Sequence, residues 1–412
     1  MSKRVRYLLG ALAVSSFGQN YQANLPVSHP AIHYFEGSLD DPVTRLENQI
    51  ERGVVKLDYR DGGLGYLPSL LTHLGINTDS QALVFSKTSF QANQISPRNP
   101  RAIYFTDDAA VGFVHGSQKL EVAGLDSRQG MVFYTLESTG KPTFSRSEVC
   151  LQCRQGPATS GVPGIFVSSV YPSSSGFPSS SGAIVTDHRT PFEDRWGGWY
   201  VTGTHGDQHH RGNAVAPNPA APEALETDGT QNPTSLIGKF SPAGYLSPVS
   251  DIVALMTLEH QTQMTNLITR LGWENRIAEH DGGDLRIGVD EIVAYMLFAD
   301  EAPLKGPIQG VSTFTQTFPQ RGPRDRRGRS FRDFDLKRRL FRYPLSYMIY
   351  SRAFDALPDI IRERIYQRLC DVLTGKDQSP RFANLSKDDR SAILEILRDT
   401  KSNLPGYLRG SQ

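Results

Sequence analysis

The chain has 412 residues, 38% of them hydrophobic, so it can form one large domain or two of ordinary size with a sizeable core. This composition excludes disorder as the general state of the chain. The 44 basic and 43 acidic residues leave a formal net charge of +1. We therefore expect no nucleic-acid or other polyanion binding by the chain as a whole.

The N-terminus has a basic head, a short apolar run and small residues around Ala13 to Gly18. This layout is typical of a secretory signal peptide, which we assign to residues 1–20, and the alternative is a buried N-terminal helix. The apolar run is too short to span a bilayer, and no longer one follows, so we expect no membrane span. Export predicts a periplasmic or secreted protein in an oxidising compartment.

Short apolar and β-branched runs alternate with turn residues in the first half of the chain, which predicts an antiparallel meander. We assign residues 21–213 to this β-rich part, which also carries the cysteine pair and a Trp/Gly/His motif. The predicted strands cover residues 54–57, 82–85, 102–105, 111–114, 120–122 and 131–134, with two more at 163–167 and 199–201.

The second half has helical patterns. Residues 214–235 contain Pro217, Pro219 and Pro222 and predict a linker or long loop before a helical part at 236–412. Ser250-Asp251 can cap a helix that ends at Gly272. Further helices are expected at 289–299, 345–357, 358–373 and after Ser386. The predicted fold class is therefore α+β, with a β-rich N-terminal half and a helical C-terminal half.

Cys150 and Cys153 form the only close cysteine pair and admit three interpretations. The first is covalent attachment of c-type haem, for which the next residue is normally an iron-binding histidine; here it is Arg154, a poor iron ligand. The second is a redox-active thiol pair, although no βαβ pattern precedes it. The third is a structural disulfide that closes a tight turn. A zinc site would need a second ligand pair.

The sequence resembles a family of exported bacterial cytochrome-c-domain proteins of unassigned physiological role. The resemblance rests on the segment that contains Cys150 and Cys153, on the block T-D-H-x-T-P-F and on the motif that runs from Trp196 to Asn213. Shorter blocks at residues 99–105 and 334–344 extend it over most of the chain. Family members carry C-x-x-C-H and H-M-G-N, whereas this chain has Arg154 and Arg211 at the histidine and methionine positions.

The resemblance implies electron transfer through covalently attached haem c, with a redox partner protein. Cys150 and Cys153 match the thioether positions, and His210 is the candidate axial ligand to the iron. The competing hypothesis is a haem-free binding or structural module in which the two cysteines form a disulfide. A haem-dependent enzyme is a third possibility, for which no catalytic acid or base can be named.

The histidines also admit interpretations that need no family. His205, His209 and His210 can be a metal cluster, haem-facing groups or a surface loop bonded to the backbone. His260 has Met256 and Met264 four residues to either side, which predicts either a porphyrin wall with His260 as a second candidate iron ligand or a core-packing stripe.

Two charged segments remain. Asp187-His188-Arg189 can surround a ligand, or it can brace Trp196 and Trp199 through a polar network. Residues 321–342 carry ten basic side chains, which indicates a solvated face, a docking surface for an acidic redox partner or contacts to haem propionates. No hydrolase, kinase or dehydrogenase motif is present, so those activities have no support.

Overall fold

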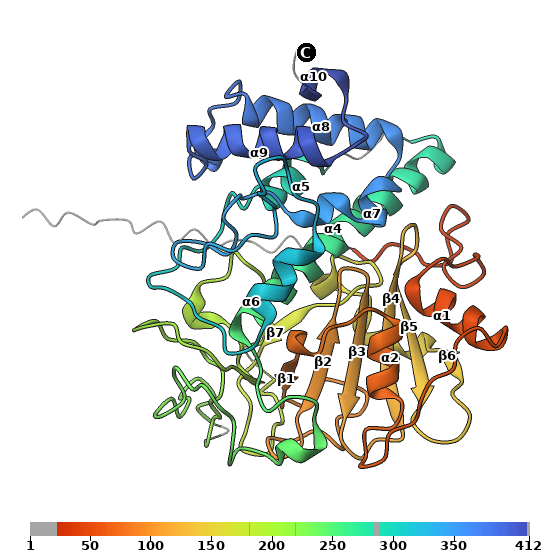
Figure 1. Ribbon diagram of the computed structural model, residues 1–412, viewed down its shortest axis with the longest axis vertical. Coiled ribbons are helices and arrows are strands. Elements are labelled where there is room, and N and C mark those ends of the chain that lie inside the picture. Colours follow the sequence, from red (N-terminus) through yellow and green to blue (C-terminus); the bar gives the residue numbers. More distant parts are fainter. Residues whose placement is uncertain (1–22, 181, 219, 284–287, 410–412) are drawn as a thin grey trace, which may run out of the picture.

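A seven-stranded antiparallel sheet forms the first half of the chain, in the order β6-β5-β4-β3-β2-β1-β9 (Figure 1). The structure, a computed structural model, describes residues 23–180, 182–218, 220–283 and 288–409, so the predicted signal peptide lies outside the described residues. The strands are β1 (Ala82–Val84), β2 (Arg101–Phe105), β3 (Ala109–Val114), β4 (Lys119–Asp126), β5 (Gly130–Glu137), β6 (Phe144–Arg146) and β9 (Trp199–Tyr200), and β7 (Val167–Ser169) pairs separately with β8 (Ile184–Thr186).

The meander predicted from the turn pattern is confirmed for β2 to β5, where each strand pairs antiparallel with the next. In the longest hairpin, Lys119 pairs with Glu137 and Asp126 with Gly130, whose positive φ suits the tight turn. The prediction of a strand at residues 54–57 is wrong, because that segment is irregular. β9 comes from the Trp/Gly/His motif and pairs with β1, which places this motif at the edge of the sheet.

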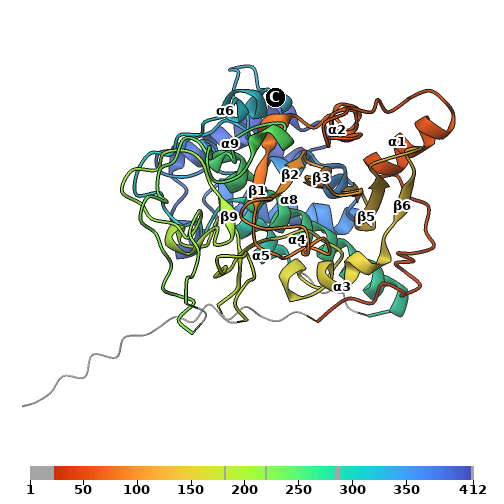
Figure 2. The same cartoon turned by 90° about the horizontal axis from the view of Figure 1, so that it is seen from below.

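Both faces of the sheet are covered, which explains why its strands are almost entirely buried (Figure 2). One face carries Tyr104, Val111 and Val132 and packs against the helices α1 (Pro42–Glu51) and α2 (Leu67–His73). The opposite face carries Phe105 and Phe133 and belongs to the larger core that includes the helical half. The period of two along each strand therefore separates two cores.

The helical half is built on α4 (Ile252–Asp281), whose 30 residues run from the sheet to the outer helices. Asp251 caps its first turn by accepting from the backbone N–H groups of Val253 and Ala254. The remaining α-helices are α3 (Leu151–Arg154), α5 (Val289–Met296), α6 (Phe314–Thr317), α7 (Arg352–Asp355), α8 (Asp359–Leu373), α9 (Lys387–Thr400) and α10 (Gly406–Arg409), with short 3-10 turns η1 (Thr78–Ser80), η2 (Glu148–Cys150), η3 (Pro157–Thr159), η4 (Phe192–Asp194), η5 (Pro242–Gly244), η6 (Phe318–Arg321), η7 (Tyr347–Tyr350) and η8 (Pro380–Phe382).

Two predicted helix boundaries are wrong. α4 does not end at Gly272. The helix continues through Trp273, which is fully buried, and its last residue is Asp281, after which Gly282 adopts the left-handed conformation. The single helix predicted at 345–357 is split into η7 and α7, since Ser351 is extended and caps the second piece. The helix from Ser386 is confirmed as α9, with the expected capping box to Asp389.

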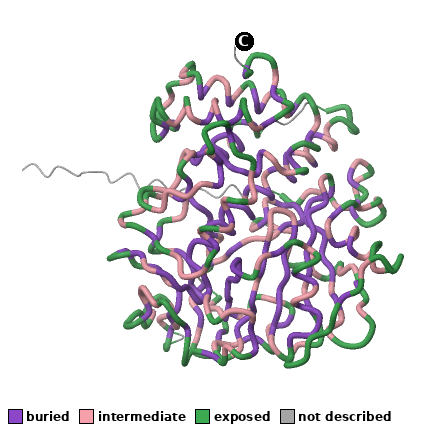
Figure 3. The backbone as a smooth tube through the Cα atoms, viewed as in Figure 1, coloured by how far each residue is buried: buried purple, intermediate pink, exposed green. Residues whose placement is uncertain are grey.

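The segment at 214–235 is irregular, as predicted, but it is fastened to the β-rich part. Ala216 pairs with Ser173, and Gln231 and Asn232 bond to residues of the Trp/Gly/His motif. It therefore behaves as an ordered loop along most of its length. Buried residues fill most of the sheet and the first two thirds of α4, while exposed residues gather in loops and outer helices (Figure 3). Among the described residues, no helix combines the length and apolar character that crossing a bilayer requires.

Candidate functional site

Cys150 and Cys153 lie in one helical turn at the end of the sheet. Cys150 ends η2, Cys153 lies in α3, and the pair follows β6 directly. Cys150 is half-buried and its thiol donates to Ser147 Oγ at 3.3 Å, whereas Cys153 is exposed. Burial raises the pKa of the Cys150 thiol above its ordinary value, which keeps it protonated at neutral pH. Both sulfurs are free thiols in the structure.

Arg154 occupies the position that follows the cysteine pair. Its guanidinium lies 5.4 Å from the centre of the Phe166 ring, a distance at which a cation is attracted to an aromatic face. Burial lowers the pKa of Arg154, and nearby Arg101 lowers it further. Its backbone carbonyl accepts from Gly164 N–H at 2.9 Å, which fixes the turn against the following segment.

His210 belongs to a buried aromatic cluster rather than to a surface loop. Its ring centre is 4.7 Å from that of His205 and 5.2 Å from that of Trp196, and Phe192 contacts all three rings. Both imidazoles are nearly or completely inaccessible to solvent. Burial lowers the pKa of His210 to about 3 and also lowers that of His205, so both rings are neutral at pH 7. His209, in contrast, is exposed.

Backbone groups set the protonation of these two rings. Gly212 N–H donates to His210 Nδ1 at 3.0 Å, and Asn232 N–H donates to His205 Nε2 at 3.1 Å. Each neutral ring therefore carries its proton on the other nitrogen. To bind a metal ion, each ring would have to move its proton to the nitrogen that now accepts a backbone hydrogen bond, and neither ring is open to an ion from solvent. The cluster is thus poorly arranged for metal ligation.

His260 lies at the centre of a buried chain of hydrogen bonds. Its Nδ1 is 2.9 Å from His188 Nδ1, and its Nε2 is 2.8 Å from Ser346 Oγ. The ring also stacks on Tyr295, with 5.3 Å between ring centres and an interplanar angle of 3°. Burial lowers the pKa values of both His188 and His260. Because both nitrogens of His260 have partners, no lone pair is free for an iron ion.

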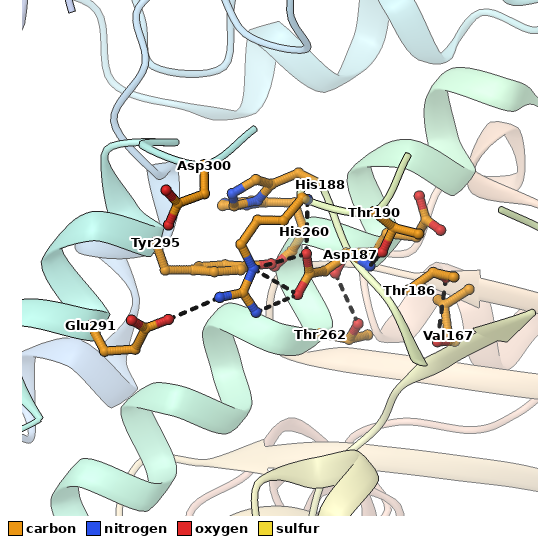
Figure 4. Close-up of polar contacts among 12 residues, drawn as sticks. Val167, Thr186, Asp187, His188, Thr190, His260, Thr262, Glu291, Tyr295 and Asp300 are labelled. Atoms are coloured by element: carbon orange, nitrogen blue, oxygen red, sulfur yellow. Dashed lines mark hydrogen bonds and ion pairs between the residues drawn. The ribbon is translucent and has the colours of Figure 1, made fainter. Parts of the chain in front are cut away.

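Arg189, which is partly exposed, joins two carboxylates in the outer part of this network, Asp187 and Glu291, and Figure 4 shows both of them near Tyr295. The guanidinium makes an ion pair with Asp187 at 2.7 Å and another with Glu291 at 2.8 Å, and it lies 4.9 Å from the centre of the Tyr295 ring. The Asp187-His188-Arg189 segment thus joins β8 to α4 and α5. These contacts are those of a polar brace, because each charged group already has a partner in the chain.

A second buried ion pair continues the network toward the Trp/Gly/His motif. Arg195 Nη1 lies 3.3 Å from Glu259 Oε2, and both side chains are almost completely buried. Burial raises the pKa of Glu259 to about 7, although Arg195, Thr186 and Trp196 all lower it. The guanidinium also donates to the His188 carbonyl at 2.9 Å. One connected polar network therefore runs from Ser346 through His260, His188 and Arg195 to Glu259.

The residues predicted to hold haem make separate sets of contacts. Within the described parts of the chain, no hydrogen bond or ring contact joins Cys150 or Cys153 to His210 or His260. His210 faces Trp196 and His205, while His260 is shared between His188 and Ser346. Together with Arg154 after the thiols, these contacts add no support to a haem that is attached through the two cysteines and ligated by either histidine, and that ligation stays a prediction.

A cavity of about 340 Å³ lies elsewhere, at the boundary between the sheet and α7. Its wall includes Asp40, Asp107, Asp108, Tyr350 and Arg352. Asp107 already pairs with Arg332 and Asp40 with Arg352. Neither this cavity nor a second one of about 20 Å³ is lined by a predicted site residue.

The basic segment at 321–342 has little free charge. Most of its side chains pair with acidic residues of the same chain, as in the ion pairs of Arg324 with Asp333, Arg327 and Arg329 with Glu395, and Arg339 with Asp389. A docking surface for an acidic partner needs unpaired positive charge, so these pairs weaken that interpretation of the segment.

Sequence reasoning missed two members of the network, Glu259 and Ser346. Glu259 could have been found, because it is the only Asp, Glu, Lys or Arg between Ile252 and Thr269, in the first part of α4. A lone carboxylate in such a segment must find a buried partner. Ser346 carries no comparable signal, since its partner His260 is 86 positions away in the sequence.

No known family model, curated protein or solved structure matches the chain. The resemblance to cytochrome-c-domain proteins therefore stays a prediction that rests on the motifs quoted above. The fold and the site define an α+β protein. It has a cysteine pair near the surface and a buried network of hydrogen bonds and ion pairs that contains His188, His260 and Arg195.

Proposed function

We propose that this chain works without haem, as an exported binding or structural module in which Cys150 and Cys153 form a disulfide. The position of Arg154 carries this proposal. Where a haem-binding chain would place its proximal histidine, this chain has a permanently charged guanidinium against Phe166. His210 and His260, the two predicted iron ligands, instead pack against aromatic rings and accept or donate hydrogen bonds inside the protein.

Both thiols are free in the structure, and the disulfide requires a local change of the backbone. Residues three apart in a helical turn have Cβ atoms about 5–6 Å apart, whereas a disulfide needs about 3.5–4.5 Å, so η2 and α3 would have to tighten when the bond forms. Exposed Cys153 can react first with a disulfide donor of an oxidising compartment, and Cys150 then displaces that donor. Two thiols lose two hydrogens in total, and the donor is reduced to its dithiol form.

A binding role is favoured by the cavity of about 340 Å³, whose volume falls within the range of small-ligand sites. The rigid network around α4 would support such a module without taking part in its chemistry. Electron transfer through haem c, with a redox partner, stays the prediction of the resemblance alone.

The test is expression of the full chain, with its N-terminal segment, in a host that has a c-type haem maturation system. The proposal predicts a folded product without a pyridine haemochrome spectrum and with the intact mass of the oxidised polypeptide. A stoichiometric haemochrome would overturn it.

The matched variant is Arg154→His, which restores the C-x-x-C-H pattern and leaves both thiols in place. Covalent haem in this variant, together with its absence from the unaltered chain, would assign the loss of haem to position 154. Haem in both proteins would contradict the proposal, because attachment would then proceed despite Arg154.

A further inference from the structure

Three potential metal ligands meet where the N-terminal segment contacts the end of α4. His29 Nε2 lies 3.3 Å from Asp281 Oδ1, and His280 Nδ1 lies 2.9 Å from the same oxygen. All three candidate ligand atoms are within 4.8 Å of one another. Two imidazoles and one carboxylate form a frequent ligand set for Zn²⁺ and related ions. No sequence motif indicates this group, because His29 is far from His280 in the sequence.

The spacing is close to what a single ion requires. Zn²⁺ binds histidine nitrogen and carboxylate oxygen at about 2.0–2.2 Å, which places tetrahedral ligands about 3.4 Å apart. The two distances to Asp281 already match that value within about half an ångström, and only the two histidines must approach each other. Their rings are edge to face, with centres 5.2 Å apart, so the two nitrogens can approach by rotation of the His280 side chain, which is about half exposed.

The group is held by ordered elements on both sides. His29 N–H donates to the Pro26 carbonyl, and the His29 carbonyl accepts from Ile32 and His33. Ile32 and Tyr34 then pack against Trp273 of α4 in a small separate core. The His29 side chain is only 16% exposed, whereas His280 and Asp281 are about half exposed, so an ion can enter from solvent.

The position at the end of α4 adds a favourable field. Asp281 is the last residue of the helix, and Gly282 follows it in the left-handed conformation. The carboxyl end of a helix carries a partial negative charge, which attracts cations. One local contact must change. Ala31 N–H donates to His29 Nδ1 at 3.1 Å. When His29 binds a metal ion through Nε2, the ring proton moves to Nδ1, and Ala31 N–H must then donate to water instead.

We propose that His29, His280 and Asp281 form a site for a divalent transition-metal ion, with Zn²⁺ as the probe, that clamps the N-terminal segment onto α4. Water completes the coordination shell, because the chain supplies three ligands. Metal binding displaces the proton from each of the two imidazole nitrogens now facing Asp281. The site is independent of the cysteine pair and of the function proposed above.

The test is a calorimetric titration of the full chain with Zn²⁺. It is carried out in a Cys150→Ser/Cys153→Ser background so that thiolates cannot compete. We expect one ion per chain and a rise in Tm with added Zn²⁺. Asp281→Asn and His280→Ala should each weaken binding at least tenfold and abolish the rise in Tm. Both positions are exposed, so these variants should keep the circular dichroism spectrum of the parent.

The matched control is His33→Ala, which removes a more exposed histidine of the same segment that pairs with Glu36 instead. It should bind Zn²⁺ as the parent does. Three results would overturn the proposal: no stoichiometric binding by the parent, unchanged affinity in both the Asp281→Asn and His280→Ala variants, or an equal loss of affinity in the His33→Ala control.

Discussion

The cysteine turn and the centre of α4 are two regions that the sequence motifs suggest as parts of one cofactor site, and they differ in almost every physical respect. Cys153 is exposed and Cys150 half-buried, and the bond of Cys150 to Ser147 is a weak one. Around α4, in contrast, Arg195, Glu259 and His260 are almost inaccessible to solvent and bonded to several neighbours.

The difference shows how the same residue types can serve two purposes. Buried histidine and arginine with charged or hydrogen-bonded partners specify a core, while thiols near solvent are available for chemistry. If this comparison is right, substitutions in the α4 region should change stability strongly, and substitutions in the cysteine turn should act mainly through the redox state.

The largest effect is expected from breaking the buried ion pair between Arg195 and Glu259. Arg195→Met leaves the Glu259 carboxylate without its cation in a site that water does not reach. We expect a loss of about 3–5 kcal/mol in the free energy of unfolding at pH 8, where the carboxyl of the unaltered chain is charged. Denaturant titration followed by fluorescence measures it.

The control for this prediction is Arg338→Ala, which removes an exposed ion pair to Asp335 and should cost less than about 1 kcal/mol. The double variant Arg195→Met/Glu259→Gln should recover part of the loss, because no charge is then left unpaired. Equal effects of Arg195→Met and Arg338→Ala would contradict the assignment of a buried brace.

A second prediction concerns pH and His210. Its folded-state pKa of about 3 is below the ordinary value of 6.5, so its contribution to stability is present above pH 6.5 and is lost as the pH falls from 6.5 toward 3. Each pH unit in this window costs about 1.4 kcal/mol per buried histidine. His188 and His260 act with the same sign, because their pKa values are also lowered.

Glu259 acts in the opposite direction. Its folded-state pKa of about 7 lies above the ordinary 4.5, so its contribution is fully present below pH 4.5 and is lost as the pH rises toward 7.

Because the pKa of His210 is lowered, a His210→Gln variant should show a shallower loss of stability between pH 6.5 and 4.5 than the unaltered chain, by about 3 kcal/mol over the window. Replacement of exposed His209 by Gln should leave the slope unchanged, and a similar change in both variants would show that burial is not the cause.

The third and smallest effect belongs to the cysteine turn. A disulfide across so short a loop restricts the unfolded chain only modestly, so Cys153→Ser should cost about 2 kcal/mol in oxidised protein. In fully reduced protein the same substitution should cost almost nothing, because Cys153 is exposed. Equilibrium unfolding with and without reductant separates the two cases, and an equal cost under both conditions would argue against a disulfide.

Local patterns in the sequence predicted much of the fold. The hairpins β2 to β5 follow from short apolar and β-branched runs that alternate with turns such as that at Gly130, and α9 follows from the capping box at Ser386. The true end of α4 could not be predicted, because Gly272 is tolerated only where Trp273 finds a buried site in the tertiary structure. α1 was missed although Asp41 caps it and Pro42 begins it, since its residues are only weakly apolar.

The candidate site was less accessible to sequence reasoning. The motifs identified His260 and His188 separately, but their contact joins residues 72 positions apart. His210 carries the strongest motif, and its burial beside Trp196 depends on how the loop at 230–232 folds back on it. Pairing across such distances depends on topology, which a single sequence does not encode in any local pattern.

The central claim is that the cysteine turn carries a disulfide and no haem. Intact-mass spectrometry of the exported protein, made in a haem-maturing host and treated with an alkylating reagent without prior reduction, tests it most directly. We predict the polypeptide mass less two hydrogens, with Cys370 as the only thiol open to alkylation. A mass increased by one haem, or alkylation of both Cys150 and Cys153, would contradict it.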